Sequence, residues 1–215
     1  MIKAVFLDLD GTLADTAPDL AYALNSVLTS SGNPPLPLER VREVASNGSA
    51  PLIQLGFGDQ LEESLFESYR QQLLTIYSEN IARETTLMGG MDELLSQLEQ
   101  RDIAWGVVTN KPARFTDPLM EQLGLSQRAA CIVSGDTTEH SKPHPKPLLH
   151  ACELLQLQPH HCIYVGDASR DIEAGNRAEM TTIAASFGYL NSHDTISEWC
   201  ADGIIDHPSE LLEWI

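Results

Sequence analysis

The chain alternates between short, continuously hydrophobic runs and longer amphipathic segments. Continuous hydrophobicity is typical of strands covered on both faces, as in a parallel sheet. The runs predicted to be strands are rich in β-branched residues and span 2–8, 103–109, 130–135, 162–167, 181–187 and 203–206. Helical spacing is found between them, in 90–101, 147–157 and 171–180. This alternation predicts an α/β fold with a doubly wound, Rossmann-like and mostly parallel sheet.

Residues 15–86 interrupt the alternation with an all-α pattern. Two amphipathic helices are predicted, at 15–28 and 59–80, and a small polar loop, SNGSAPL (46–52), lies between them. Thr16 and Asp19 have nearly the spacing of a capping box for the first helix. We therefore predict a catalytic core made of residues 1–14 and 87–215, with a helical cap domain inserted at 15–86.

Composition narrows the classes of partner. Hydrophobic residues make up 42% of the chain, enough for a core, and 31 acidic against 13 basic residues give a net charge of −18. This charge argues against binding to nucleic acid or to an anionic membrane, and a solvated acidic surface explains it. No apolar stretch approaches the roughly 20 residues that span a bilayer. We expect a cytoplasmic protein, monomeric or homodimeric.

The four cysteines form no C-x-x-C pair, and each lies in or beside an apolar segment. We expect four buried or half-buried thiols rather than a disulfide framework, as in a reducing compartment.

Two carboxylates, Asp8 and Asp10, stand at the end of the first predicted strand, before Gly11 and Thr12. Side chains at i and i+2 of a strand project to the same side, where their repulsion needs a cation or a shared proton. The plain alternative is a strand end followed by an Asp-Gly turn.

Three further segments place polar side chains near the same edge of the sheet. Thr109 and Asp167 each end a predicted strand, and Asp171 follows where a helix should begin. Ligands of such folds bind beyond the carboxyl ends of the strands. Lys142 begins a proline-rich segment, 142–147, that is predicted to be extended and to present its ammonium group to a phosphate; an exposed loop lysine is the alternative.

Together these residues have the composition of a phosphoryl-transfer site. A carboxylate can serve as the nucleophile, and lysine and threonine can bind phosphoryl oxygens. Clustered carboxylates suit Mg²⁺, which prefers oxygen ligands.

The motifs DLDGT, VVTN, KPHPKP and GDASRD resemble those of the haloacid dehalogenase superfamily, in its phosphatase branch, over essentially the whole chain. The resemblance implies roles for the individual residues. Asp8 is the nucleophile that forms an aspartyl-phosphate, and Asp10 is the general acid and base. Thr109 and Lys142 hold the phosphoryl group. The Mg²⁺ ligands are Asp8, the backbone carbonyl of Asp10 and Asp167, with Asp171 in support.

Within that superfamily, DGTLADTAPDL and KPHPKPLL are similar to phosphoglycolate phosphatases, and DIEAGNRA and WCADGIIDHPSEL to N-acetylmuramic acid 6-phosphate phosphatases. The expected partner is thus a small phosphorylated metabolite. The candidates for substrate binding are Asn110 and the insert's Ser46, Asn47 and Gly48; an ordinary interhelical turn is the alternative for the last three.

Two other functions share parts of this pattern. A sugar phosphomutase would use the same four motifs and differ in the cap. A non-catalytic phospho-receiver module also combines acidic residues with a threonine and a lysine, but it lacks a helical insert and a carboxylate in the position of Asp10.

Several other polar residues have a plain interpretation. His140 and His144 flank Lys142, where we expect a solvated loop rather than a zinc site. Lys111, Arg114 and Arg170 lie near the predicted site and could attract an anionic substrate, although exposed charges are the simpler expectation. Three aromatic residues of the second insert helix are expected in the core of the cap: Phe66, Tyr69 and Tyr77.

Overall fold

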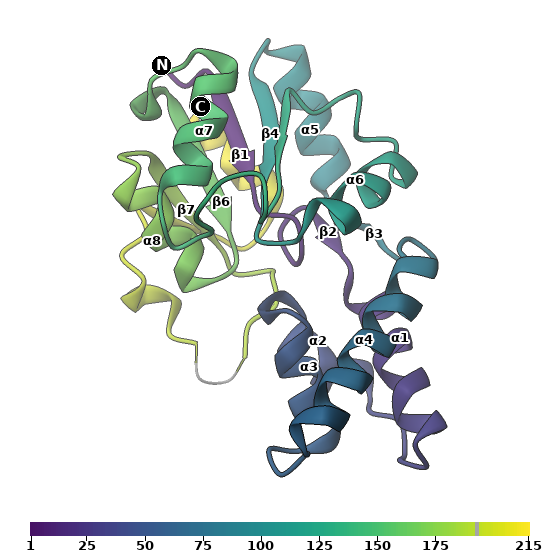
Figure 1. Cartoon of the computed structure of the whole chain (residues 1–215). Helices are drawn as coiled ribbons and strands as arrows, with labels where there is room; N and C mark the ends of the chain where they lie inside the picture. The colour runs from purple at the N-terminus through teal and green to yellow at the C-terminus, as the bar shows by residue number, and fades with distance from the viewer. Residues whose placement is uncertain (192–193) are drawn as a thin grey trace.

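The computed structural model describes residues 1–191 and 194–215 and contains a six-stranded parallel sheet (Figure 1). The strand order is β5-β4-β1-β6-β7-β8, so β1 lies in the middle, between β4 and β6. The strands are β1 (Ala4–Leu7), β4 (Ala104–Val108), β5 (Cys131–Val133), β6 (Cys162–Gly166), β7 (Thr181–Ala185) and β8 (Gly203–Ile205). Each coincides with a predicted run, which confirms the predicted α/β fold.

Strand β1 is buried on both faces. Val5 and Leu7 belong to one hydrophobic cluster, and Ala4 and Phe6 to another on the opposite side of the sheet. Successive side chains of a strand point to opposite faces, so a strand with helices on both sides must be hydrophobic at every position. This explains why the run has no polar alternation.

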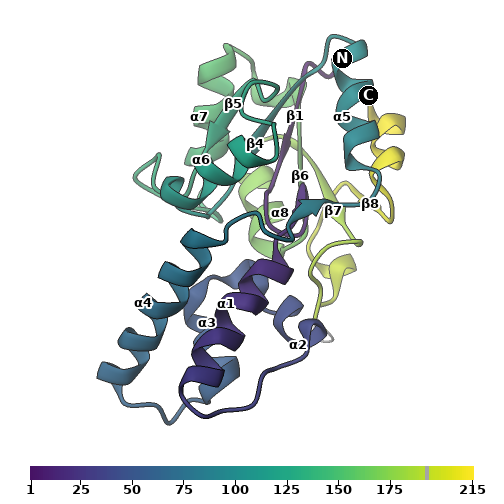
Figure 2. The ribbon, with the colours of Figure 1, turned by 90° about the vertical axis from the view of Figure 1, so that its right-hand side faces the viewer.

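Helices cover the two faces of the sheet (Figure 2). Residues of α7 and α8 contribute to the cluster around Phe6, and residues of α5 and α6 to the cluster around Leu7. The bounds are α5 (Met91–Gln100), α6 (Ala113–Gln122), α7 (Lys146–Leu155) and α8 (Ser169–Arg177); short 3₁₀ helices are η2 (Pro159–His161), η3 (Ile196–Glu198) and η4 (Pro208–Trp214).

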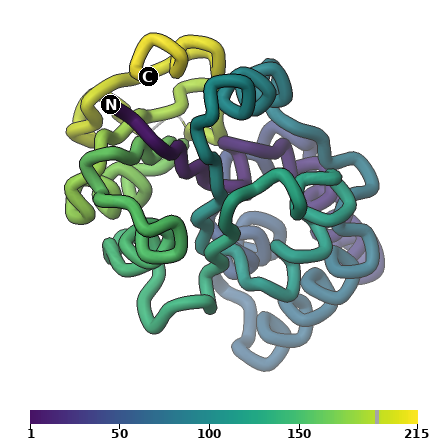
Figure 3. Tube along the Cα trace, turned by 90° about the horizontal axis from the view of Figure 1, so that it is seen from above, coloured from purple at the N-terminus to yellow at the C-terminus, as the bar shows by residue number. Residues whose placement is uncertain are grey.

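The helices of residues 17–79 form a separate group beyond the carboxyl ends of the strands, while both termini lie at the opposite end of the sheet (Figures 1 and 3). Its elements are α1 (Ala17–Ser30), α2 (Leu38–Arg42), η1 (Ala45–Asn47), α3 (Ser49–Phe57) and α4 (Glu63–Glu79). Helix α1 packs against the other three α-helices. The chain enters and leaves this group through β2 (Ala14–Asp15) and β3 (Thr86–Leu87), which pair antiparallel.

Several local predictions for this helical group are wrong. The segment predicted as a polar loop contains η1 and the start of α3, because Gly48 (φ +88°) separates two helical segments. No capping box forms at Thr16: its hydroxyl donates to Asp10, and Asp19 instead accepts hydrogen bonds from Thr85, next to β3.

The thiols only partly follow the expectation. Cys131, Cys152 and Cys162 are buried, but Cys200 is exposed. Within the described ranges, the structure has no helix of the length and apolarity needed to cross a membrane.

Candidate active site

Four carboxylates and a threonine meet at the carboxyl edge of the sheet, on the side of the helical group. Asp8 follows β1, Thr109 follows β4 and Asp167 follows β6, while Asp171 lies in the first turn of α8. These four residues are at least 97% buried, and Asp10 is 9% exposed. The predicted convergence of these side chains is therefore observed.

Asp8, Asp167 and Asp171 form a compact acidic cluster, with one carboxylate oxygen of each lying within 4.8 Å of the others. Lys142 is the cation at this cluster. Its Nζ lies 2.9 Å from Asp8 Oδ1 and 2.7 Å from Asp171 Oδ1, and its side chain is fully buried. The alternative of an exposed loop lysine is wrong.

The segment around Lys142 is also less extended than predicted. The His144 amide donates to the Ser141 carbonyl at 3.0 Å, which closes a turn, and α7 begins at Lys146. Pro147 fits in the first turn of that helix because an amide proton there has no intrahelical acceptor.

The charges of the cluster are only partly balanced. Burial alone would raise the pKa of Asp8, but Lys142 and Arg170 hold it below its ordinary value. Burial lowers the pKa of Lys142 less than the neighbouring carboxylates of Asp171 and Asp8 raise it, so this lysine stays protonated. Burial, together with Asp8 and Asp171, raises the pKa of Asp167 to about 8. The cluster therefore has an excess of carboxylates that a bound cation would relieve.

Asp10 is held apart from this cluster by different partners. Its Oδ1 accepts hydrogen bonds from the Thr16 hydroxyl (2.6 Å) and from Lys111 Nζ (2.9 Å). The Lys111 side chain is only 7% exposed, so the expectation of an exposed charge is wrong for this residue. The backbone carbonyl of Asp10 accepts a hydrogen bond from the Ser46 hydroxyl at 3.1 Å.

Thr109 and Asn110 shape the loop after β4. The Thr109 hydroxyl accepts a hydrogen bond from the Lys111 amide at 3.2 Å. The Asn110 side chain donates to the Lys142 carbonyl and accepts from the Lys142 amide, both at 2.9 Å. Asn110 thus fixes the backbone that carries the buried ammonium group, and its predicted contact with substrate stays a prediction.

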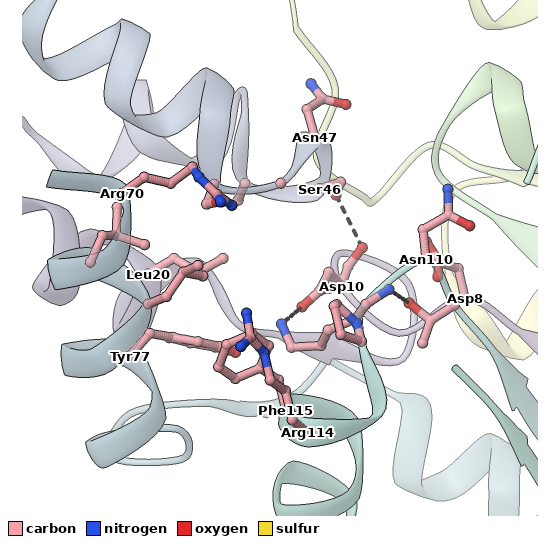
Figure 4. A pocket seen from close by; sticks show the side chains of 18 of the residues that line it. Asp8, Asp10, Leu20, Ser46, Asn47, Arg70, Tyr77, Asn110, Arg114 and Phe115 are labelled. Carbon is pink, nitrogen blue, oxygen red and sulfur yellow. Dashed lines mark hydrogen bonds and ion pairs between the residues drawn. The ribbon is translucent and has the colours of Figure 1, made fainter. Parts of the chain in front are cut away.

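A cavity of about 380 Å³ lies between this edge and the helical group (Figure 4). Asp8, Asp10, Thr109 and Asn110 line it on the sheet side. Its opposite wall contains the predicted substrate-binding residues of the insert: Ser46, Asn47 and Gly48. The cavity therefore joins the acidic cluster to the insert.

Arg170 connects the two walls. It lies one residue before Asp171, and its guanidinium donates to the Ser46 carbonyl and to Asn47 Oδ1, each at 2.9 Å. Arg170 is half-buried rather than plainly exposed, and it bridges core and insert.

Tyr77 of α4 also faces the core. Its ring lies 4.7 Å from Lys111 Nζ and 5.6 Å from the Phe115 ring of α6. It is therefore buried as predicted, but at the boundary with the core. Phe66 and Tyr69 are half-buried, as their expected place in the helical group requires.

Sequence reasoning missed Tyr189. Its amide donates to Asp167 Oδ2 at 2.7 Å, and its hydroxyl donates to Asp15 Oδ1 at 2.6 Å and accepts from the Ala17 amide at 2.9 Å. Nothing in the local pattern of residues 181–191 indicates these contacts, because the partners of the hydroxyl, Asp15 and Ala17, lie more than 150 positions earlier in the chain.

The histidines beside Lys142 lie outside the acidic cluster. The His140 and His144 rings lie 4.3 Å apart, and the one cluster of potential metal ligands within the described residues is the acidic cluster.

The haloacid dehalogenase-like hydrolase family model matches residues 5–185, a range that contains all four carboxylates, Thr109 and Lys142. The chain belongs to this family. Among relatives of this hydrolase, an N-acetylmuramic acid 6-phosphate phosphatase of Pseudomonas aeruginosa is 41% identical over 212 residues, covering 99% of this chain and 94% of the relative. A phosphoglycolate phosphatase of Xanthomonas campestris pv. campestris is 37% identical, covering 98% and 95%.

Solved structures agree with this assignment. A predicted phosphoglycolate phosphatase from Haemophilus somnus 129pt has a TM-score of 0.88 and 29% identity, covering 99% of this chain and 97% of that one. Because its relatives along nearly the whole chain are named as phosphatases, this haloacid dehalogenase-like hydrolase is a phosphomonoester hydrolase.

Proposed function

We propose that the protein hydrolyses a small phosphomonoester through an aspartyl-phosphate on Asp8. One observation carries the proposal: the Asp8 carboxylate stands at the cavity, ion-paired with the buried ammonium group of Lys142, and with its pKa held below the ordinary value. An ionised carboxylate beside a fixed cation is suited to attack an electrophilic phosphorus. The new Asp8–phosphorus bond forms as the bond to the leaving oxygen breaks.

Asp10 supplies the proton transfers in this proposal. It lines the same cavity, and its partners Thr16 and Lys111 both contact Oδ1, which orients the carboxyl group. It gives a proton to the leaving alkoxide. It then takes one from the water that attacks the phosphorus of the aspartyl-phosphate, which breaks the Asp8–phosphorus bond and releases inorganic phosphate. General acid–base catalysis of this kind contributes typically about 10²- to 10⁴-fold.

Thr109 and Lys142 bind the phosphoryl oxygens in this proposal. Lys142 Nζ already lies within hydrogen-bonding distance of Asp8 and Asp171. Its raised pKa keeps it protonated at neutral pH. Its positive charge offsets the charge that develops on the phosphoryl oxygens in the transition state.

The acidic cluster fits Mg²⁺. It offers hard oxygen ligands close together, and Asp8 Oδ1 is buried without an aligned hydrogen bond. Asp8, Asp167 and the Asp10 carbonyl would hold the ion, with Asp171 in support, while the ion would supply further neutralisation of the phosphoryl oxygens. In the structure described here, the Ser46 hydroxyl occupies the hydrogen-bonding position at the Asp10 carbonyl.

The substrate is proposed to be of the phosphoglycolate or N-acetylmuramic acid 6-phosphate type, as the names of the relatives suggest. Residues 15–86 are proposed to act as a cap domain, with 1–14 and 87–215 as the catalytic core. The division is supported by the β2–β3 pair, where the chain enters and leaves the helical group. Arg170 and Ser46 hold this cap against the core.

Phosphate release in the presence of Mg²⁺ tests the proposal. The substrates are p-nitrophenyl phosphate, 2-phosphoglycolate and N-acetylmuramic acid 6-phosphate, and Asp8→Asn is the decisive variant because it keeps the shape of the side chain. We expect release by the wild type and none above background by the variant. Wild-type turnover by Asp8→Asn would overturn the assignment of Asp8 as the nucleophile. Isomerisation of a sugar phosphate without net phosphate release would favour the mutase, and a phosphorylated Asp8 that persists for hours would favour a receiver.

A further inference from the structure

The cavity gathers basic side chains in an otherwise acidic protein. The whole chain has 13 basic and 31 acidic residues, yet four basic residues line this one cavity: Arg70, Lys111, Arg114 and Arg170. A cationic wall in a protein of net charge −18 is the reverse of its average surface. Such a wall attracts anions and raises their local concentration.

Three of these four side chains already have close polar partners. Lys111 is paired with Asp10, Arg70 makes hydrogen bonds to both carboxylate oxygens of Glu67 at 2.8 and 2.9 Å, and Arg170 binds η1 at Ser46 and Asn47. Their charges are therefore partly or wholly occupied in the protein itself.

Arg114 differs from the other three. Among the described residues, the one polar or ring interaction of its side chain is with the face of the Phe115 ring, whose centre lies 4.7 Å from the guanidinium carbon, and no carboxylate of those residues lies within ion-pair distance. Stacking on an aromatic face leaves the N–H edges of the guanidinium available. These edges match the two oxygens of a carboxylate.

Arg114 is separated from the phosphoryl end of the cavity by an apolar wall. The Phe115 ring packs on Tyr77, and Tyr77 in turn lies against Lys111, the partner of Asp10. In Figure 4, Asp10 lies between Arg114 and Asp8. The large apolar side chains that line the cavity are Leu20, Leu73, Leu74, Tyr77 and Phe115. This arrangement fits a ligand with a carbon framework between two anionic groups.

We infer that Arg114 binds a carboxylate of the substrate, and that the preferred substrates are phosphorylated acids whose acid group is separated from the phosphate by a body of sugar size. This inference rests on the proposed function, since it takes the phosphate to bind at Asp8. The cavity of about 380 Å³ is within the range of small-molecule sites, roughly 300–1,000 Å³. A carboxylate that remains in water contributes little to selectivity, whereas one paired with Arg114 makes a charge-assisted bond.

Two sugar phosphates that differ in one acid group test the inference. N-acetylmuramic acid 6-phosphate carries a lactyl carboxylate that N-acetylglucosamine 6-phosphate lacks. We expect Arg114→Gln to lower kcat/KM for the acidic sugar about 10- to 100-fold and to leave the neutral sugar within about twofold. Arg114→Lys should retain part of the preference, since it keeps the charge without the planar fork.

Two controls make the result specific. Arg101→Gln removes an exposed arginine outside the cavity and should change kcat/KM for neither sugar phosphate. The circular dichroism spectrum and melting temperature of Arg114→Gln should equal those of the wild type, which shows that the variant is folded.

Each contrary result has a distinct meaning. Equal losses for both sugars would reduce Arg114 to long-range attraction and overturn the inference, as would an unchanged preference in Arg114→Gln. If the wild type hydrolyses p-nitrophenyl phosphate but neither sugar phosphate, the inference of a sugar-sized substrate is overturned, while the proposed phosphatase activity is kept. Absence of phosphate release from every compound would overturn the proposed function, and the inference with it.

Discussion

Lys111 and Asp10 form a buried ion pair, with Nζ 2.9 Å from Oδ1, although 101 positions separate them in the chain. Burial alone would lower the pKa of Lys111, but the Asp10 carboxylate and Tyr77 raise it above its ordinary value, so Lys111 stays protonated. Thr16 donates to the same oxygen of Asp10. Both bonds fall on Oδ1, which leaves Oδ2 as the oxygen that can exchange a proton with substrate.

Replacement of Lys111 tests whether this pair positions Asp10. We expect Lys111→Met, which keeps the length of the side chain, to lower kcat by about tenfold or more and to change KM less, because the chemical step loses an oriented carboxyl group. A variant with wild-type kcat would show that Thr16 suffices to orient Asp10.

Loss of the Tyr189 hydroxyl should weaken the contact between the core and the helical group. Tyr189→Phe removes the bonds to Asp15 and to the Ala17 amide but keeps the backbone bond to Asp167. We expect the free energy of unfolding to fall by about 1–3 kcal/mol, because a buried amide is left without an acceptor. Chemical denaturation measures this loss. The affinity for Mg²⁺, measured by calorimetry, should change little, and a large fall in affinity would contradict this division of roles.

Gly11 should tolerate no side chain. Its φ is +84°, and a Cβ there would lie 2.2 Å from Asp167 Oδ2. Gly32 has a similar φ of +78° but open space around the same position. Gly32→Ala therefore reports the backbone penalty alone, about 1 kcal/mol.

We expect Gly11→Ala to lose phosphatase activity and Mg²⁺ binding, and Gly32→Ala to lose only stability. Equal activity of the two variants would show that the region around Asp167 can relax.

Metal binding should depend on pH through Asp167. Its pKa, raised to about 8 from an ordinary value of 3.8 by burial and by the neighbouring Asp8 and Asp171, means that the folded metal-free protein holds a proton that the unfolded chain releases. Between about pH 4 and pH 8 the metal-free protein therefore loses stability as the pH rises.

A divalent cation must displace that proton. The apparent affinity of the protein for the cation should thus rise by up to about tenfold per pH unit towards pH 8 and then level off. Calorimetric titration with Mg²⁺ at about pH 6, 7, 8 and 9 measures this slope. The same affinity at every pH would show that Asp167 is ionised throughout.

The local sequence determined the strands, the helical insert and the order of the chemistry along the chain. A strand buried on both faces must be hydrophobic at every position. The run that ends at Asp8 can therefore be predicted as a strand without knowledge of the strands that pair with it. Because the carboxyl ends of parallel strands share one edge, Asp8, Thr109 and Asp167 could be expected to meet there. Helix α3 could not be predicted in this way, since its nine residues begin with Ser-Ala-Pro and show little helical periodicity.

Only the tertiary structure decided which partner each polar side chain has. Thr16 has the sequence context of a helix cap but donates to Asp10, and Lys111 has the context of an exposed loop but is buried beside Tyr77. Tyr189 joins Asp167 to Asp15 across more than 150 positions of chain. Hydrophobic periodicity is a property of neighbouring residues, whereas the partner of a buried charge depends on which distant segments pack around it, and that packing is settled only when the whole chain has folded.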